Sequence, residues 1–222
     1  KADWEHHCPH CGEYMHFLPT PETKINPQNQ YAMSKHSQEL IAINLGRRYG
    51  IPSVAMRYSI VQGPRQSFYN AYSGALRIFN LHLYFDRQPT IYEDGMQIRD
   101  YVNYQDVVNA NIMVLENEEA NYQGYNVGGG KAYTVTEFYN KVQEVTGKTL
   151  EPVIKKFYRY GDTRHIFSDI SKLKSLGWEP KVPIESSIAD YWDYLKKQTD
   201  IEDILEYADK TMKHQGVVRA IK

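Results

Sequence analysis

The sequence predicts an α/β fold built on a parallel sheet, and three observations support this prediction. Segments with helical periodicity alternate with short apolar segments, which is the order expected of parallel βαβ units. Turns that contain glycine, such as the one at Gly63, separate these segments. The 222 residues are enough to bury a sizeable core, as one large domain or two small ones.

The first quarter of the chain is expected to form a loop, a helix and a strand. Residues 1–29 are rich in proline and lack periodicity, so they predict a loop. Residues 30–50 predict a helix, because apolar side chains recur with a 3.6-residue period and Gly50 provides an end. The apolar run 51–58 is typical of a buried parallel strand. The turn at 63–66 follows it, at the sheet edge where ligands bind in open α/β folds.

The remaining elements follow from the same signals. Thr134 and Glu137 have the spacing of a capping box, in which hydroxyl and carboxylate each satisfy a free amide at a helix start. Asp169 is expected to cap a short helix ending at 177–178. A helix is expected at 68–88, with Leu76, Phe79 and Leu83 on one stripe. Further helices are expected at 106–116, 134–146, 183–195 and 200–214, and strands or extended segments at 90–92, 99–104, 122–127 and 151–157.

Composition excludes several classes of partner. The formal net charge is -1, which argues against a nucleic-acid-binding surface or an anionic membrane surface. No apolar run is long enough to span a bilayer, and the chain opens without a signal-peptide pattern. We therefore expect a cytoplasmic protein without nucleic-acid or membrane partners.

Cys8 and Cys11 have the spacing of half a structural zinc site. A tetrahedral site needs two further ligands, and the neighbouring histidines are too close in sequence to reach the same metal well. Two interpretations stay open. The cysteines are either ordinary thiols in a loop, or half of a zinc knuckle whose other half lies upstream of Lys1.

Tyr31 and Lys35 are four residues apart, so a helix places both side chains on one face. A positive neighbour favours the charged form of a phenol, which suits a general acid or base. The alternative is a solvated helix face, because the chain contains 19 tyrosines and such pairs arise by chance.

The order of the motifs resembles the extended short-chain dehydrogenase/reductase superfamily, and within it the NAD-dependent nucleotide-sugar epimerases and dehydratases. The matching segments are Tyr31 with Lys35, then 63–66, 95–100, 125–128, 161–165, 169–172 and 176–180. More narrowly, the segments at 8–12, 19–22 and 93–95 resemble those of dTDP-L-rhamnose 4-epimerases.

The resemblance implies the carboxyl-terminal part of a doubly wound, Rossmann-like parallel sheet plus a small substrate-binding domain. Residues 1–66 would be the second half of a dinucleotide-binding domain, with an inserted Cys-x-x-Cys loop. Residues 67–222 would be mainly the substrate domain, with 99–130 returning to the sheet. The glycine-rich turn for the cofactor pyrophosphate would lie upstream of Lys1.

The resemblance also implies a role for each matching residue around NAD. Tyr31 would transfer a proton, and Lys35 would hold the nicotinamide ribose. Tyr58 and Val61 would line the nicotinamide end.

Other matching residues would bind the substrate. Arg99 would grip the diphosphate, because its planar fork matches phosphate oxygens. Asn126, Arg159 and Asp162 would contact the nucleotide. Taken singly, each has an ordinary alternative: Arg99 in a surface ion pair with Asp100, Asn126 in a turn, and Arg159 as a solvated cation.

Two positions depart from the family pattern. Ile60 stands where asparagine is usual, and Gln62 where tyrosine is usual. An isoleucine cannot replace the hydrogen bond of the amide, which affects substrate preference or activity itself.

The function implied is a 4-epimerase that works through a 4-keto intermediate on a dTDP-6-deoxyhexose such as dTDP-L-rhamnose. A homodimer would form through the Tyr31 helix and the helix after Tyr58. The alternatives are a UDP-sugar 4-epimerase, a dTDP-sugar 4,6-dehydratase, a non-catalytic nucleotide-sugar-binding protein, and a small zinc-knuckle interaction module with possible structural zinc.

Overall fold

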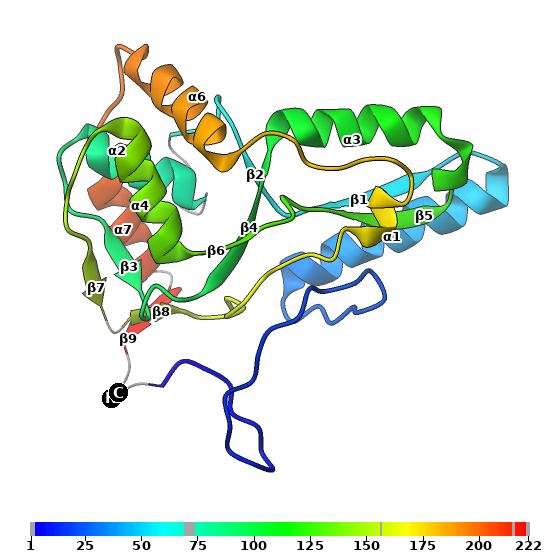
Figure 1. Ribbon diagram of the computed structural model, residues 1–222, viewed down its shortest axis with the longest axis horizontal. Coiled ribbons are helices and arrows are strands. Elements are labelled where there is room, and N and C mark those ends of the chain that lie inside the picture. Colours follow the sequence, from blue (N-terminus) through cyan, green and yellow to red (C-terminus); the bar gives the residue numbers. More distant parts are fainter. Residues whose placement is uncertain (1–2, 69–73, 156, 215, 221–222) are drawn as a thin grey trace.

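The computed structural model describes residues 3–68, 74–155, 157–214 and 216–220. Its helices and strands form two groups, which lie side by side in Figure 1. The helices are α1 (Gln30–Tyr49), α2 (Ala75–Tyr84), α3 (Tyr104–Glu116), α4 (Val135–Thr146), α5 (Ser171–Lys174), α6 (Ile184–Lys196) and α7 (Leu205–His214), with a 3₁₀ turn at Glu118–Ala120. The strands are β1 (Val54–Tyr58), β2 (Ile60–Gln62), β3 (Thr90–Tyr92), β4 (Ile98–Asn103), β5 (Gln123–Val127), β6 (Ala132–Thr134), β7 (Val153–Lys155), β8 (Phe157–Arg159) and β9 (Val218–Ala220).

The first group contains a parallel pair of strands between two helices. β1 pairs with β5 in parallel, and Figure 1 shows α1 on one side of the pair and α3 on the other. Buried side chains of α3, β5 and α5 form a hydrophobic cluster in this group, among them Ala110, Tyr125 and Leu173. The prediction that 51–58 is a buried strand is correct for its direction but wrong for its burial. Within the described residues β1 pairs along one edge only, and Tyr58 is 47% exposed.

The second group mixes parallel and antiparallel pairs. β2 pairs with β4 in parallel, and so does β3 with β7. β6 runs antiparallel to β4, and β9 antiparallel to β8. The prediction of parallel units throughout is therefore wrong for these two pairs. The expected strands did not include β6 or β9, which have three residues each.

Helices α2, α4, α6 and α7 surround the core of the second group (Figure 1). The stripe predicted on α2 is confirmed, since Leu76, Phe79 and Leu83 are all buried. Both hydrogen bonds of the capping box join Thr134 and Glu137. α2 and α7 are shorter than expected, and 69–73 lie outside the described residues. No helix in the described ranges is both long and apolar enough to cross a membrane.

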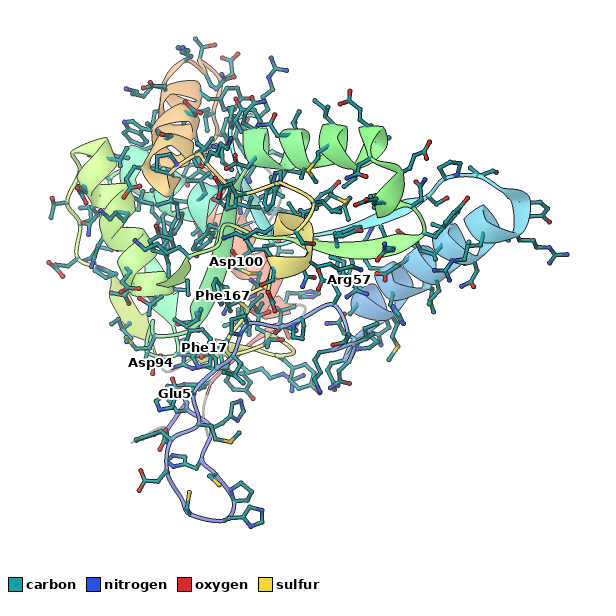
Figure 2. All side chains as sticks on the ribbon, turned by 45° about the vertical axis from the view of Figure 1, so that its right-hand side comes forward. Glu5, Phe17, Arg57, Asp94, Asp100 and Phe167 are labelled. Atoms are coloured by element: carbon teal, nitrogen blue, oxygen red, sulfur yellow. The ribbon has the colours of Figure 1, made fainter. Side chains whose placement is uncertain are left out.

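The carboxylate of Asp100, on β4, connects the two groups. It is fully buried and accepts hydrogen bonds from the Ser59 hydroxyl at 2.7 Å, the Ser168 amide at 3.1 Å and the Gly129 amide at 2.8 Å. A Cβ atom at Gly128 would lie 2.2 Å from the same carboxylate, so this close approach requires glycine. Figure 2 shows Asp100 where the two groups meet. A surface ion pair of Asp100 with its neighbour Arg99 is thereby excluded.

Residues 3–18 form an arm that ends in a hairpin, and both cysteines lie in its turn. His7 and Tyr14 form an antiparallel bridge, and the Gly12 amide donates to the Cys8 carbonyl at 2.9 Å. Cys8 and Cys11 are both free thiols. Among the described residues no group of three or more potential ligands could hold a metal, so the predicted zinc site finds no support in this chain.

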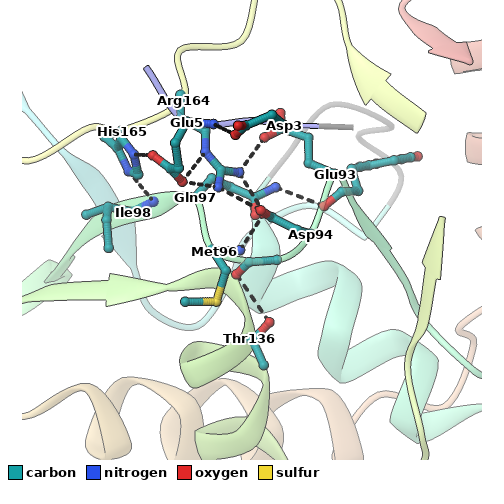
Figure 3. A network of polar contacts seen from close by, with 12 residues as sticks. Asp3, Glu5, Glu93, Asp94, Met96, Gln97, Ile98, Thr136, Arg164 and His165 are labelled. Carbon is teal, nitrogen blue, oxygen red and sulfur yellow. Dashed lines mark hydrogen bonds and ion pairs between the residues drawn. The ribbon is translucent and has the colours of Figure 1, made fainter. Parts of the chain in front are cut away.

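Arg164 fastens the arm to the second group, as Figure 3 shows. Its guanidinium pairs with Glu5 of the arm, with Glu93 at 2.6 Å and with Asp94 at 2.8 Å. His165 contacts the other oxygen of Glu5 at 2.9 Å. Burial opposes ionisation of Glu5 and Asp94, but the hydrogen bonds from Arg164 outweigh it and lower the pKa of both carboxyl groups.

These lowered pKa values predict a loss of stability in acid. A carboxyl group whose pKa is lower in the folded state stabilises the fold above its unfolded pKa, and loses this contribution as the pH falls through its folded pKa. We expect the free energy of unfolding, measured by urea titration, to fall as the pH drops below about 4. Arg164→Gln should lower it by about 3 kcal/mol at pH 7, because carboxylates lose a buried partner, and should flatten its pH dependence.

The matched control is Arg48→Gln, which removes an exposed guanidinium on α1 and should leave the acid profile unchanged. Limited proteolysis of the arm gives a second measurement, with faster cleavage expected in Arg164→Gln. An Arg164→Gln protein with the stability and acid profile of the wild type would show that Arg164 does not fasten the arm.

Candidate active site

Tyr31 and Lys35 lie together in the first turns of α1. The side chain of Asn29 accepts a hydrogen bond from the Ala32 amide at 2.8 Å and caps the helix just before Tyr31. The Lys35 ammonium lies 5.5 Å from the centre of the Tyr31 ring, as the four-residue spacing predicts. The start of a helix carries partial positive charge, which together with this ammonium favours a negative charge nearby.

These two side chains line a cavity of about 820 Å³ between α1, β1 and residues 24–27. Tyr58 and Ser59 line it as well, from the carboxyl end of β1. Tyr31 is 72% exposed, so its hydroxyl is accessible to a molecule that enters. We call this space the Tyr31 cavity.

The structure separates the two residues expected at the nicotinamide end. Tyr58 lines the Tyr31 cavity, and its hydroxyl donates to Asn111 of α3 at 2.8 Å. Val61 lies in β2, where it pairs with Val102, and it is not among the residues lining the Tyr31 cavity. Its expected contact with the cofactor therefore has no support from its position.

A second cavity, of about 350 Å³, brings together three of the four predicted substrate residues. Arg99 lines it from β4, Arg159 from β8, and Asp162 from the turn that follows β8. Arg159 and Asp162 approach to 3.8 Å. Apolar side chains complete the wall, so the space combines a charged part with an apolar part. We call it the Arg99 cavity.

Hydrogen bonds hold Arg99 in place. One of its guanidinium nitrogens donates to the carbonyls of Ile98 at 2.8 Å and Arg164 at 2.9 Å. Burial lowers the pKa of Arg99, and the nearby carboxylate of Asp162 opposes this. Because an arginine pKa starts above 12, the group keeps its charge at neutral pH. The cavity therefore presents a fixed positive charge.

Three residues that line the Arg99 cavity have a buried polar atom without a hydrogen-bond partner in the described part of the chain. They are the Nε of Arg159, the side-chain oxygen of Gln97 and the hydroxyl of Tyr101. Burial raises the pKa of Tyr101, so its hydroxyl keeps its proton and can donate. Unpaired buried polar atoms are costly.

Consecutive residues of the link between β1 and β2 line the two cavities. Ser59 lines the Tyr31 cavity and Ile60, the next residue, lines the Arg99 cavity. Asp100 fixes this link through the Ser59 hydroxyl, and Arg99 is its chain neighbour.

Asn126 does not reach the Arg99 cavity. Its side-chain amide donates to the Thr20 carbonyl at 2.9 Å and to the Asp169 carbonyl at 3.0 Å. It is also 7% exposed and lies in β5, in the first group of elements. The position therefore supports a structural role, fastening residue 20 to the sheet, in place of the expected nucleotide contact.

The sequence-based prediction missed Gln97, Tyr101 and Met212, which also line the Arg99 cavity. Tyr101 carried a usable signal, since residues two apart on a strand share a face and Arg99 had been identified. Gln97 and Met212 carried none, because a turn and the last helix bring them to the cavity.

Comparison with known proteins places this geometry in a family. The family described as GDP-mannose 4,6 dehydratase matches residues 12–191. A dTDP-L-rhamnose 4-epimerase of Burkholderia thailandensis is 28% identical over 80% of this chain and 49% of its own length. A UDP-glucose 4-epimerase of Mycolicibacterium smegmatis is 30% identical over 82% of this chain and 58% of its own. The chain thus spans about half the length of these curated relatives.

Solved structures agree with this assignment. A UDP-glucose 4-epimerase from Thermotoga maritima, solved with UDP-glucose, has a TM-score of 0.76 and 37% identity, covering 84% of this chain and 60% of that one. A UDP-glucose 4-epimerase from Thermus thermophilus, solved with NAD, has a TM-score of 0.69 and 30% identity, covering 82% and 60%. The fold is the predicted Rossmann-like α/β fold, and the chain belongs to the GDP-mannose 4,6 dehydratase family of nucleotide-sugar epimerases and dehydratases.

Proposed function

We propose that the protein acts as an NAD-dependent nucleotide-sugar 4-epimerase. One observation supports this function above the others, namely that two consecutive residues, Ser59 and Ile60, line the Tyr31 cavity and the Arg99 cavity respectively. A nucleotide sugar has the matching layout, with its diphosphate between the base and the sugar. The diphosphate would lie near Arg99, and the sugar would extend towards Tyr31.

Each residue then has a chemical task. The phenol of Tyr31 accepts the proton of the sugar O4 and later returns it, which is general base and general acid catalysis by one group. The Lys35 ammonium lies 5.5 Å from the centre of the Tyr31 ring, on the same face of α1. Arg99 and Arg159 bind the diphosphate oxygens through charge-assisted hydrogen bonds, and Asp162 accepts from ribose hydroxyls.

The residues of the Tyr31 cavity fit NAD as the cofactor. Tyr31, Lys35 and Tyr58 would hold its nicotinamide ribose, and the cavity of about 820 Å³ has room for this part of the cofactor. When bound, NAD supplies the hydride chemistry at C4 of the sugar, and the protein supplies position and proton transfer.

For the substrate we propose a dTDP-6-deoxyhexose such as dTDP-L-rhamnose. Ile60 offers no hydrogen bond at the cavity junction, and an apolar side chain there suits the methyl group of a 6-deoxy sugar. A UDP-hexose is the second candidate, because the Thermotoga maritima relative with 37% identity was solved with UDP-glucose.

We also propose a homodimer. α1 exposes a set of apolar side chains, and α1 is one of the two helices expected at the subunit interface. The exposed set comprises Met33, Leu40, Ile41 and Leu45.

Tyr31→Phe tests the catalytic role. The variant should lower kcat for interconversion of dTDP-L-rhamnose and its C4 epimer by about 100-fold to 10,000-fold, since the proton-transferring hydroxyl is lost. Binding of dTDP should be unchanged, because Tyr31 lies outside the Arg99 cavity. Turnover is measured by separating the two nucleotide sugars by chromatography.

Tyr49→Phe is the matched control, since it removes an exposed tyrosine hydroxyl from the same helix, outside the Tyr31 cavity. Equal turnover by Tyr31→Phe and the wild type would refute the proposed enzymatic function. A wild type that binds dTDP but shows no turnover of any nucleotide sugar would indicate the non-catalytic alternative.

Arg99→Gln tests the diphosphate contact. The loss of a buried charged partner should raise the Kd for dTDP by about 30-fold or more, measured by isothermal titration calorimetry. Binding should also lose much of its dependence on salt concentration. The control Arg65→Gln removes an exposed charge and should keep the wild-type Kd. Identical affinities in Arg99→Gln and the control would place the diphosphate elsewhere.

A further inference from the structure

The carboxyl-terminal segment 201–220 lies beyond the family match, which ends at residue 191, yet it contributes a wall to the Arg99 cavity. Met212 of α7 is 6% exposed and lines that cavity. In Figure 1, α7 lies among α2, α4 and β3, and β9 lies beside β8. A segment outside the common family region thus borders the site that the family region builds.

Two anchors fix the position of α7. Ile204 and Leu205, where the helix begins, are buried in the same hydrophobic cluster as α2. Arg87, which follows α2, forms an ion pair with Asp203. The start of α7 is therefore held against α2 by apolar burial and by charge.

The end of α7 is held by β9. The Val217 amide donates to the Met212 carbonyl at 3.1 Å, and β9 then pairs antiparallel with β8. In this pair Val218 lies opposite Arg159, one of the cations of the Arg99 cavity. The Tyr160 amide donates to the Val217 carbonyl at 2.8 Å, which extends the pairing. The same short strand therefore positions both Met212 and Arg159.

The chemistry of Met212 restricts what it can contact. Its thioether offers no strong hydrogen bond, so it is a poor partner for sugar hydroxyls or phosphate oxygens. The apolar residues Ile78 and Phe79 of α2 line the same cavity. Thioether sulfur packs favourably on aromatic rings, and the base is the only aromatic group of a nucleotide sugar.

The layout of the cavity also indicates that Met212 lies near the base. Ile60 lines the Arg99 cavity, and its chain neighbour Ser59 lines the Tyr31 cavity, so Ile60 marks the side where the sugar would lie. Met212 comes instead from α7, which packs on α2 and reaches β8 through β9. The part of the ligand furthest from the sugar is the base, on the other side of the diphosphate.

We propose that α7 and β9 form the base-binding wall of the Arg99 cavity and that Met212 packs against the pyrimidine ring of a nucleoside diphosphate. Met212 is then a residue that determines which nucleotides bind, supplied by a part of the chain outside the family match. This inference rests on the proposed function, since it takes the Arg99 cavity to be the nucleotide site.

The test compares ligands with and without a base. UDP, dTDP and inorganic pyrophosphate are titrated calorimetrically into the wild type and into Met212→Ala, Met212→Leu and Met212→Gln. Met212→Ala and Met212→Gln should raise the Kd for UDP and dTDP about tenfold, since an apolar contact with the ring is lost. Met212→Leu, close in volume and apolar, should stay near the wild type. Pyrophosphate should bind all four proteins equally.

Met96→Ala is the matched control, because Met96 is half exposed and is not among the residues lining the cavity. Equal affinity of all Met212 variants for UDP and dTDP overturns the inference and leaves the proposed function intact. An equal loss of pyrophosphate affinity overturns it too, because the defect would then be a general loosening. Failure of the wild type to bind either nucleotide refutes the proposed function itself.

Discussion

The buried carboxylate of Asp100 is the interaction on which the candidate site depends. Its three hydrogen bonds tie β4 to the β1–β2 link, to the turn after β5 and to residue 168. Each partner belongs to a different part of the chain, so one side chain sets how the two groups of elements meet. Because Ser59 is one of these partners, the same carboxylate also holds a residue that lines the Tyr31 cavity. Arg99 is positioned by the same contacts, because it is the chain neighbour of Asp100.

A second set of charges stabilises the outer wall of the Arg99 cavity. Arg164 gathers Glu5, Glu93 and Asp94, while its carbonyl accepts a hydrogen bond from Arg99. The arm and the β3–β4 turn are therefore coupled to the guanidinium that would bind diphosphate. A charge cluster of this kind is more valuable for geometry than for stability, since burial costs offset much of its attraction. The cavity gains fixed donors, which bind a ligand without first having to be ordered.

Local signals predicted much of the fold and part of the site. The helix at Tyr31, the strand after it, the α2 stripe and the capping box at Thr134 all depend on residues close in sequence, and the structure contains each of them. Arg99, Arg159 and Asp162 were brought to one cavity as the family resemblance implied. The errors concern long-range contacts. Asn126 bonds to residue 20, β6 and β9 are antiparallel, and Met212 reaches the cavity from the last helix, and none of these leaves a periodic signature.

The central claim is that one nucleotide sugar binds across both cavities, and a crystal structure with NAD and dTDP-L-rhamnose bound tests it most directly. The account predicts the diphosphate on Arg99 and Arg159, the base against Met212, and the sugar O4 within hydrogen-bonding distance of the Tyr31 hydroxyl. A diphosphate bound outside the Arg99 cavity, or a sugar directed away from Tyr31, would contradict it.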